Sequence, residues 1–344
     1  MPKLFEPPDP AASHAASPTL AARVRAAIPG TSWTEARELC HGGRVSVDGR
    51  ESTDPAWRPP PGSRVEVLPP AAARGAGGTA GAEPRTASLV VYADDDVVVV
   101  RKPAGILTVP FVREDRDTLL ALARVALRRI EKGRAQAPVT AGRNPTLRAV
   151  QRLDRETSGL VVFARRVGAQ RHLQQQLAER SVVRRYEALV HGAARNAVYD
   201  TWIAADRGDG LRGSVEEPHP GRQPAPDSRR AVTRVRVLAE LRGATHVACE
   251  LETGRQHQIR IHLAEAGHPL IGETVYIRDY VRAGTRPGVP PSPGSRRPVI
   301  EAPRPMLHAA VLGFAHPRDG RPLLFEEPPP ADFAALLTRL RQRR

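Results

Sequence analysis

The sequence predicts an α+β fold with a mixed, largely antiparallel sheet. Four consecutive valines at 97–100 are followed by Lys-Pro-Ala-Gly, a pattern typical of a fully buried strand that ends in a turn. At 185–190 the chain alternates, with Tyr186, Ala188 and Val190 on one face, which indicates a second strand. Mixed strand and helix patterns of this kind favour α+β over a repeated βαβ arrangement.

Length and composition are consistent with one large core and a small accessory domain. The chain has 344 residues, of which 40% are hydrophobic, and two cysteines, which provide no disulfide framework. The N-terminus lacks a signal-peptide pattern, and no run of about eighteen apolar residues occurs. We expect a soluble cytoplasmic protein that is monomeric by default.

Residues 1–17 are rich in Pro and Ala and are expected to form a disordered tail. A small domain is expected at 18–68. Within it, a capping box at 32–35 begins a helix that Gly42-Gly43 ends.

The same small domain is predicted to contain two strands. Residues 44–47 form the first, which turns at Asp48-Gly49, and residues 62–67 form the second. An Ala- and Gly-rich stretch at 69–87 follows, and we expect it to be a flexible linker.

A larger domain is expected at 88–344, with the candidate catalytic residues. Asp117 or Thr118 is placed to cap a helix with apolar residues on one face up to Ile130. Another helix is expected at 170–178. Loop-like insertions are expected at 218–227 and 282–305, and the second is a candidate RNA-contact flap.

Between Thr253 and Gly267 the apolar period is helical, with Gly267 placed as the residue that ends the helix. Arg260 falls on a face other than the apolar stripe, so we expect it to point toward a cleft. A charged helix residue is more often simply solvated. His257 and His262 lack nearby Cys or acidic residues at metal-ligand spacing, and no zinc site is expected.

The stretch 150–160 places Asp154 between Arg152 and Arg155, directly before an apolar run. Flanking guanidinium groups lower the pKa of a carboxylate, and partial burial limits its solvation. This combination suits a carboxylate that attacks carbon or removes a proton. From spacing alone, a structural Asp–Arg pair fits equally well.

This stretch resembles the catalytic motif of the RluA family of pseudouridine synthases, written H-R-L-D-x-x-T-S-G-L, and residues 152–160 match it without a gap. Gln151 replaces the usual His, and its amide forms hydrogen bonds but carries no charge. Further segments resemble the family in order along the chain: 94–107, 185–190, 253–263, 267–272, 307–310 and 314–317.

The resemblance implies roles for individual residues. Asp154 would be essential, either as nucleophile or as the base that removes a sugar proton, with Arg260 as its ion-pair partner. Tyr186 would lie against the target base, although as a residue it also fits a core tyrosine. Arg152 would enter the space left by a flipped-out uridine. No metal or organic cofactor is implied.

The small domain at 18–68 resembles an S4 RNA-binding domain, less closely than the catalytic match. That resemblance implies that Arg37 and Arg44 contact the RNA backbone, and Arg155 and Arg255 are further candidates for RNA binding. The fold implied is therefore a pseudouridine synthase domain preceded by a small α/β S4-like domain.

The formal net charge of +15 favours a polyanionic partner, although a general bias toward Arg gives the same excess. We expect an RNA pseudouridine synthase without obligate protein partners, acting on large-subunit rRNA in preference to tRNA. Two rivals remain: a catalytically silent RNA-binding factor in ribosome assembly, suggested by Gln151, and a hydrolase that uses Asp154 with water.

Overall fold

The computed structural model describes residues 18–31, 33–41, 43–52, 55, 57–68, 89–110, 115, 117–134, 146–207, 211–215, 227–277, 280 and 298–341. The tail at 1–17, the linker at 69–87, Ser32 and most of the two predicted insertions lie outside these residues. The chain divides into two compact units, residues 1–74 with 208–211 and residues 75–207 with 212–344. In the described residues, no helix is long and apolar enough to cross a membrane.

The first unit combines two helices with a small antiparallel sheet of order β2-β1-β3. Its elements are α1 (Leu20–Ala27), α2 (Trp33–His41), β1 (Val45–Val47), β2 (Arg50–Glu51) and β3 (Val65–Val67). Asp48 and Gly49 both have positive φ, 51° and 76°, as a tight hairpin turn requires. The predicted helix and hairpin are confirmed, whereas α1 was not predicted.

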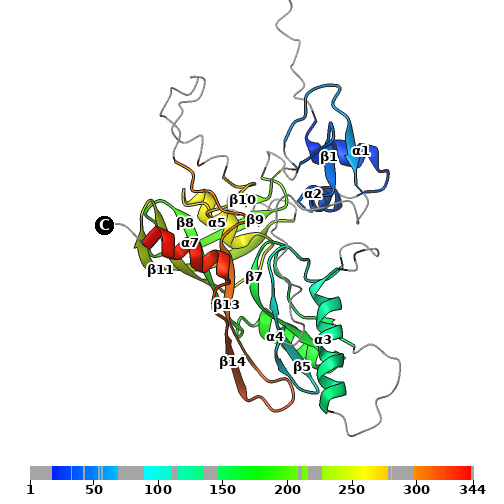
Figure 1. Ribbon diagram of the computed structural model, residues 1–344, viewed down its shortest axis with the longest axis vertical. Helices are drawn as coiled ribbons and strands as arrows, with labels where there is room; N and C mark the ends of the chain where they lie inside the picture. The colour runs from blue at the N-terminus through cyan, green and yellow to red at the C-terminus, as the bar shows by residue number, and fades with distance from the viewer. Residues whose placement is uncertain are drawn as a thin grey trace, which may run out of the picture. The chain divides into compact units, whose positions relative to one another are not determined.

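The second unit is built on an eleven-stranded sheet with the path β10-β9-β11-β12-β8-β13-β7-β5-β4 (Figure 1). Its strands are β4 (Val90–Ala93), β5 (Val97–Lys102), β6 (Arg148–Ala149), β7 (Ser158–Ala164), β8 (Val183–His191), β9 (Ala197–Ala204), β10 (Gly213–Val215), β11 (Arg229–Leu241), β12 (Ala244–Leu251), β13 (Leu307–Ala315) and β14 (Pro322–Glu326). Among the described strands, only β13 and β7 pair in parallel. The prediction of a mixed, largely antiparallel sheet is therefore confirmed.

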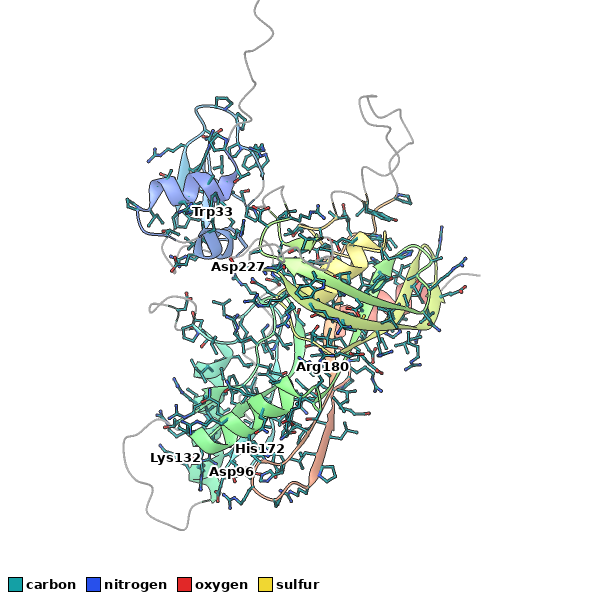
Figure 2. The ribbon with its side chains drawn as sticks, turned by 180° about the vertical axis from the view of Figure 1, so that it is seen from behind. Trp33, Asp96, Lys132, His172, Arg180 and Asp227 are labelled. Atoms are coloured by element: carbon teal, nitrogen blue, oxygen red, sulfur yellow. The ribbon has the colours of Figure 1, made fainter. Side chains whose placement is uncertain are left out.

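In the described part of this unit, four helices pack on the two faces of the sheet: α3 (Leu119–Arg134), α4 (Val167–Ala178), α5 (Gln258–Glu265) and α7 (Ala331–Arg341). Helices α3 and α5 share one core with Val98, Val100, Ala188 and Val190. Helix α4 packs on Val97 and Val99, and α7 on Leu189, at the opposite face. Figure 2, seen from behind, shows His172 on α4 and Arg180 just after that helix.

Core burial explains why the strongest apolar runs were predictable. Val97 to Val100 are all fully buried, because helices cover both faces of β5. Each fully buried Leu or Phe contributes roughly 1.5–3 kcal/mol through apolar burial. Thr118 rather than Asp117 caps α3, since its hydroxyl accepts from the Ala121 N–H at 3.3 Å.

One prediction about local structure was wrong. The helix expected from Thr253 begins only at Gln258, and its first seven residues are all buried, including Arg260. It is therefore surrounded by protein, and no solvated face distinguishes Arg260. The matched segment 307–310 and the first part of the segment 314–317 lie in one continuous strand, β13, which β14 flanks.

Candidate active site

Asp154 lies in the loop between β6 and β7, and the backbone of this loop is held by other segments. The Thr108 hydroxyl donates to the Leu153 carbonyl at 2.9 Å and accepts from the Leu153 N–H at 3.1 Å. The Arg304 guanidinium donates to the Glu156 carbonyl at 3.0 Å. These bonds fix the backbone on both sides of Asp154, so its side chain starts from a fixed position, as a reacting group requires.

Lys102, the last residue of β5, is buried against the same loop. Its ammonium donates to the carbonyls of Pro103, Arg155 and Thr157 at 3.0, 2.7 and 2.8 Å. Burial lowers the pKa of Lys102 to about 7, although nearby carboxylates, including Asp154, act in the other direction. Lys102 therefore fixes the loop and, when protonated, adds positive charge beside Asp154.

The Asp154 carboxylate faces a nitrogen on each side. Its Oδ2 lies 3.8 Å from Nη1 of Arg260, and its Oδ1 lies 4.0 Å from Nε2 of His257. Both distances exceed those of direct hydrogen bonds. The Asp154 side chain retains 27% of its exposure, so a substrate can reach it.

The pKa of Asp154 departs from the sequence-based expectation. Burial raises it above its usual range, while Arg260 and Lys102 oppose this effect and Arg152 contributes less. The flanking Arg152 lowers this pKa as expected, but burial outweighs the arginines, so the pKa is raised overall. Arg155 is directed elsewhere, since its Nε donates to the Gly105 carbonyl at 2.9 Å. A carboxylate with a raised pKa is a stronger base and a better nucleophile once ionised.

Tyr186 lies in β8 with its side chain in the core beneath the site, and it is 8% exposed. Burial raises the pKa of Tyr186 to about 12, Arg184 opposes this shift and Asp154 adds to it. The phenol therefore stays protonated at neutral pH. The influence of Asp154 on this pKa indicates that the two side chains belong to one electrostatic site.

Arg260 is the predicted residue whose surroundings differ most from expectation. Its Nε and Nη2 bind both oxygens of Glu273 at 2.8 and 2.7 Å. Its guanidinium also lies over the Tyr276 ring, 5.2 Å from the centroid, and the Tyr276 hydroxyl bonds Nδ1 of His257 at 2.8 Å. Sequence reasoning missed Glu273, Tyr276 and the role of His257. The one available signal was an acidic residue directly after the apolar segment Leu270-Ile271-Gly272.

The residues predicted to bind RNA are spread over both units. Arg152 is exposed, and Nε of Arg255 donates to the Arg230 carbonyl at 3.0 Å. In the first unit, Arg37 lies over the Trp33 ring at 5.6 Å. Both Nε and Nη2 of Arg44 donate to the Leu68 carbonyl at 3.2 and 3.1 Å. RNA contact by these arginines stays a prediction.

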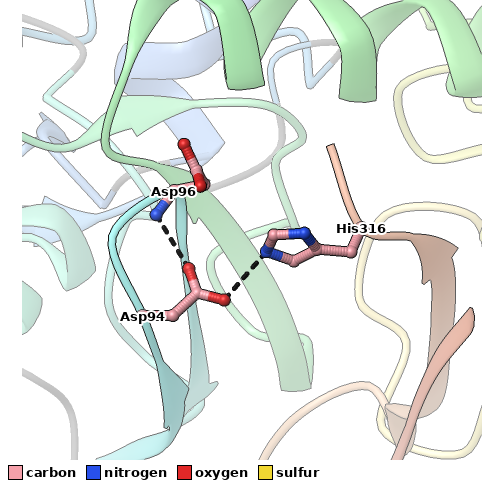
Figure 3. Close-up of side chains that lie close together, drawn as sticks. All are labelled: Asp94, Asp96 and His316. Atoms are coloured by element: carbon pink, nitrogen blue, oxygen red, sulfur yellow. Dashed lines mark hydrogen bonds and ion pairs between the residues drawn. The ribbon is translucent and has the colours of Figure 1, made fainter. Parts of the chain in front are cut away.

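One group of the described residues brings metal-binding atom types together, at the β4–β5 turn and the end of β13 (Figure 3). Ligand atoms of Asp94, Asp96 and His316 lie within 4.8 Å of one another. The Asp94 carboxylate already accepts from the Tyr92 hydroxyl at 2.7 Å and two backbone N–H groups, and it bonds Nε2 of His316 at 2.9 Å. Nε of Arg318 forms an ion pair with Oδ2 of Asp96 at 2.6 Å. Because Asp94 and His316 bond each other and Asp96 pairs with Arg318, the group is better described as a structural network than as a metal site.

At two positions of the matched motifs, a nearby backbone leaves no room for any residue larger than glycine. Gly159 has a φ of 119°, and a Cβ there would collide with the Ala309 backbone, which pairs with it across the parallel β7–β13 contact. Gly272 has a φ of 82°, and a Cβ there would collide with the Arg304 carbonyl. Both close approaches bring β13 and the Glu273 segment near the Asp154 loop.

Comparison with known proteins places this geometry in a family. A family model described as RNA pseudouridylate synthase matches residues 96–265. Ribosomal large subunit pseudouridine synthase D of Nitrosomonas europaea is 37% identical over 260 residues, which cover 73% of this chain and 65% of that protein. The protein of the same name from Pseudomonas aeruginosa is 35% identical, with 74% of this chain and 72% of that protein covered.

An RNA pseudouridine synthase of Bacillus subtilis, YlyB, described as uncharacterized, is 32% identical over 323 residues, which are 90% of each chain. The match thus spans slightly less than two thirds of the Nitrosomonas relative and most of the Bacillus one. Among solved structures, Human RNA Pseudouridylate Synthase Domain Containing 4 has a TM-score of 0.50 at 21% identity, covering 73% of this chain and 92% of that chain, and shows the same fold. On the sequence matches, this chain belongs to the RNA pseudouridylate synthase family.

Proposed function

We propose that the protein isomerises specific uridines in RNA to pseudouridine, with Asp154 as the essential residue. The observation that carries this proposal is the Asp154 carboxylate, held on a fixed loop with Arg260 and His257 3.8 and 4.0 Å away. Its raised pKa and remaining exposure suit a group that reacts with a substrate.

The reaction breaks the bond between N1 and C1′ of uridine, turns the base and forms a bond between C5 and C1′. The proton on C5 is lost and N1 gains one, so substrate and product are isomers. Asp154 acts at the sugar, as a nucleophile at C1′ or as the base that removes a sugar proton. Arg260 stabilises the carboxylate, and Tyr186, whose phenol stays protonated, lies against the base. No metal or organic cofactor takes part.

The uridine must leave its helix before Asp154 can reach it, at a cost of a few kcal/mol. We assign to Arg152, which is exposed, the space that the uridine leaves. Arg37, Arg44, Arg155 and Arg255 contribute backbone contacts that position the RNA without reading its sequence. The protein acts in the cytoplasm as a monomer.

Large-subunit rRNA is the proposed substrate, with tRNA as the second choice. The support is that the relatives from Nitrosomonas europaea and Pseudomonas aeruginosa are named ribosomal large subunit pseudouridine synthase D. The S4-like character of the first unit agrees with a structured RNA target.

Pseudouridine mapping in cells tests the function and the target together. Ribosomal and transfer RNA are compared from wild-type cells, a deletion strain and the deletion strain carrying Asp154→Asn. We expect sites in large-subunit rRNA to disappear in the deletion strain and to stay absent with the Asn variant. Restoration by Asp154→Asn would instead support the silent assembly factor, in which the carboxylate has no chemical role.

A further inference from the structure

Glu273 is a fully buried carboxylate that lies between Arg260 and a tight turn. Its side chain has 0% exposure. Oε1 accepts from the backbone N–H groups of Thr274, Val275 and Tyr276 at 3.1, 2.9 and 3.3 Å. Burial would raise the pKa of Glu273, but Arg260 and these N–H groups outweigh it and leave the pKa lowered. Glu273 is therefore a fixed negative charge that RNA cannot touch.

The Arg260 guanidinium divides its three nitrogens unequally between two carboxylates. Nε and Nη2 make a two-point contact with Glu273 at 2.8 and 2.7 Å, and Nη1 is left 3.8 Å from Asp154. Charged Arg–carboxylate bonds are usually 2.7–2.9 Å long, so the Asp154 contact is about 1 Å too long for a direct bond. Turning Arg260 toward Asp154 would break the contact with Glu273. The Tyr276 ring below the guanidinium adds a second restraint.

We propose that Glu273 is a positioning residue, which holds Arg260 at a set distance from Asp154 and so keeps both carboxylate oxygens available for the uridine. The inference rests on the proposed function and adds a residue to it. Without Glu273, Asp154 would be the nearest carboxylate for Arg260, and a direct bond would form. A carboxylate in such a bond is a weaker nucleophile and base. The bond would also rotate the Asp154 side chain away from its position toward the substrate.

The charges around Asp154 give the direction of the pH effect. Glu273 adds to the burial that raises the Asp154 pKa, whereas Arg260, Lys102 and Arg152 lower it. Among the described residues, His257, Tyr186 and Tyr276 also face the site. Loss of the Glu273 charge and a closer Arg260 both lower the Asp154 pKa. Since Asp154 acts ionised, the acid limb of activity then moves to lower pH.

The test uses the full chain and compares steady-state pseudouridine formation on large-subunit rRNA across pH. Glu273→Gln keeps the shape and still accepts from N–H groups, but it loses the charge. We expect kcat to fall about hundredfold with KM within twofold of wild type, and the acid limb to move to lower pH. A role limited to folding would not move the acid limb in this direction.

Glu273→Asp keeps the charge but is too short for the two-point contact. We expect its kcat to fall about tenfold with the acid limb close to that of the wild type. Glu265→Gln is the matched control, because Glu265 lies on α5, the helix that carries Arg260, and pairs with Arg207 at 3.6 Å. It should keep wild-type kcat.

The outcomes separate the two proposals. Wild-type protein that forms no pseudouridine would reject the proposed function. An active wild type whose Glu273→Gln variant keeps its kcat within twofold, or whose acid limb moves to higher pH, would reject only the role of Glu273. If Glu273→Gln does not fold, Glu273→Asp decides, and a wild-type kcat in that variant would overturn the proposal.

Discussion

Two clusters of carboxylates and arginines in the second unit differ in how closely their charges approach. At the β4–β5 turn, Asp94 is bonded at 2.7–2.9 Å to Tyr92, His316 and two backbone N–H groups (Figure 3). These bonds outweigh the effect of burial and lower the pKa of Asp94. At the candidate active site, the nearest charged or titratable partners of Asp154 lie 3.8 and 4.0 Å away, and its pKa is raised.

The comparison shows that a carboxylate with cationic neighbours can serve either stability or reactivity. Direct bonds satisfy every acceptor and stabilise the fold, but they leave the carboxylate nothing to offer a substrate. A cation held at a distance partly balances the charge and leaves the oxygens free to react. Substitutions should therefore separate stability from activity: the first cluster controls the former and the second the latter.

Among the partners that surround the two carboxylates, the largest effect is expected at Arg260, the cation nearest Asp154. Arg260→Lys keeps the charge but cannot bind Glu273 at two points while a third nitrogen faces Asp154. We expect kcat for pseudouridine formation to fall about hundredfold, in line with misplacement by about 1 Å. RNA affinity, measured by filter binding, should change little. If Arg260→Lys keeps the wild-type kcat, catalysis does not depend on Arg260 binding Glu273 with two nitrogens while the third faces Asp154.

The next effect is expected on stability, at the bonded cluster. Asp94→Asn should reduce the free energy of unfolding by about 1–3 kcal/mol, because bonds to a buried network are lost or weakened. Since the folded-state pKa of Asp94 is lowered, its stabilising effect is present above pH 4 and is lost as pH falls through that pKa. The variant should therefore depend less on pH in denaturant titrations below pH 4.

The activity of the folded Asp94→Asn protein should equal that of the wild type. Asp95→Asn is the control, because Asp95 is 68% exposed and its arginine contacts are 3.4 Å or longer. Its unfolding free energy should stay within about 0.5 kcal/mol of wild type. Lower activity in Asp94→Asn would mean that the two clusters are coupled.

A smaller effect on activity is expected from Tyr276→Phe. This change removes the 2.8 Å bond to Nδ1 of His257 but keeps the ring beneath Arg260. His257 then loses the partner that orients Nε2 toward Asp154, and we expect kcat to fall about threefold to tenfold. A fall as large as that of Arg260→Lys would place the main positioning role on His257 instead.

The smallest effect is expected on the pH dependence of the free energy of unfolding. Because the pKa of Lys102 is about 7 in the folded chain and about 10.4 unfolded, the unfolded state binds more protons in between. The free energy of unfolding should rise from pH 7 to about 8.5, above which the raised pKa of Cys249 acts in the opposite direction. Lys102→Gln does not titrate and should show a flatter profile. If wild type and Lys102→Gln show the same slope, the pH dependence comes from groups other than Lys102.

Predictions from sequence succeeded where a local signal dominates the structure. The buried valine run, the Asp48-Gly49 turn and the end of α5 at Gly267, with a φ of 81°, all follow from short-range patterns. Strands β9 to β12 were not predicted. Strand β9 is only partly buried, β11 is rich in Arg, and both pair with residues distant in sequence. The start of helix α5 was mispredicted, since burial on all sides removes the amphipathic signal.

For the site, sequence and family resemblance singled out Asp154 and Arg260, which the structure brings within 3.8 Å. The pKa direction was not predictable, because it depends on burial by residues distant in sequence. Glu273 was not predictable either. Its role depends on a two-point contact and three N–H groups, which no spacing in the sequence indicates.

The most direct test of the central claim uses purified protein and protein-free large-subunit rRNA. Wild type and Asp154→Asn are incubated with the RNA, and pseudouridine content, free uracil and RNA mass are measured. We predict pseudouridine with unchanged RNA mass and no uracil for wild type, and at least a thousandfold slower formation for Asp154→Asn. Equal yields from both proteins, or release of uracil, would contradict the account.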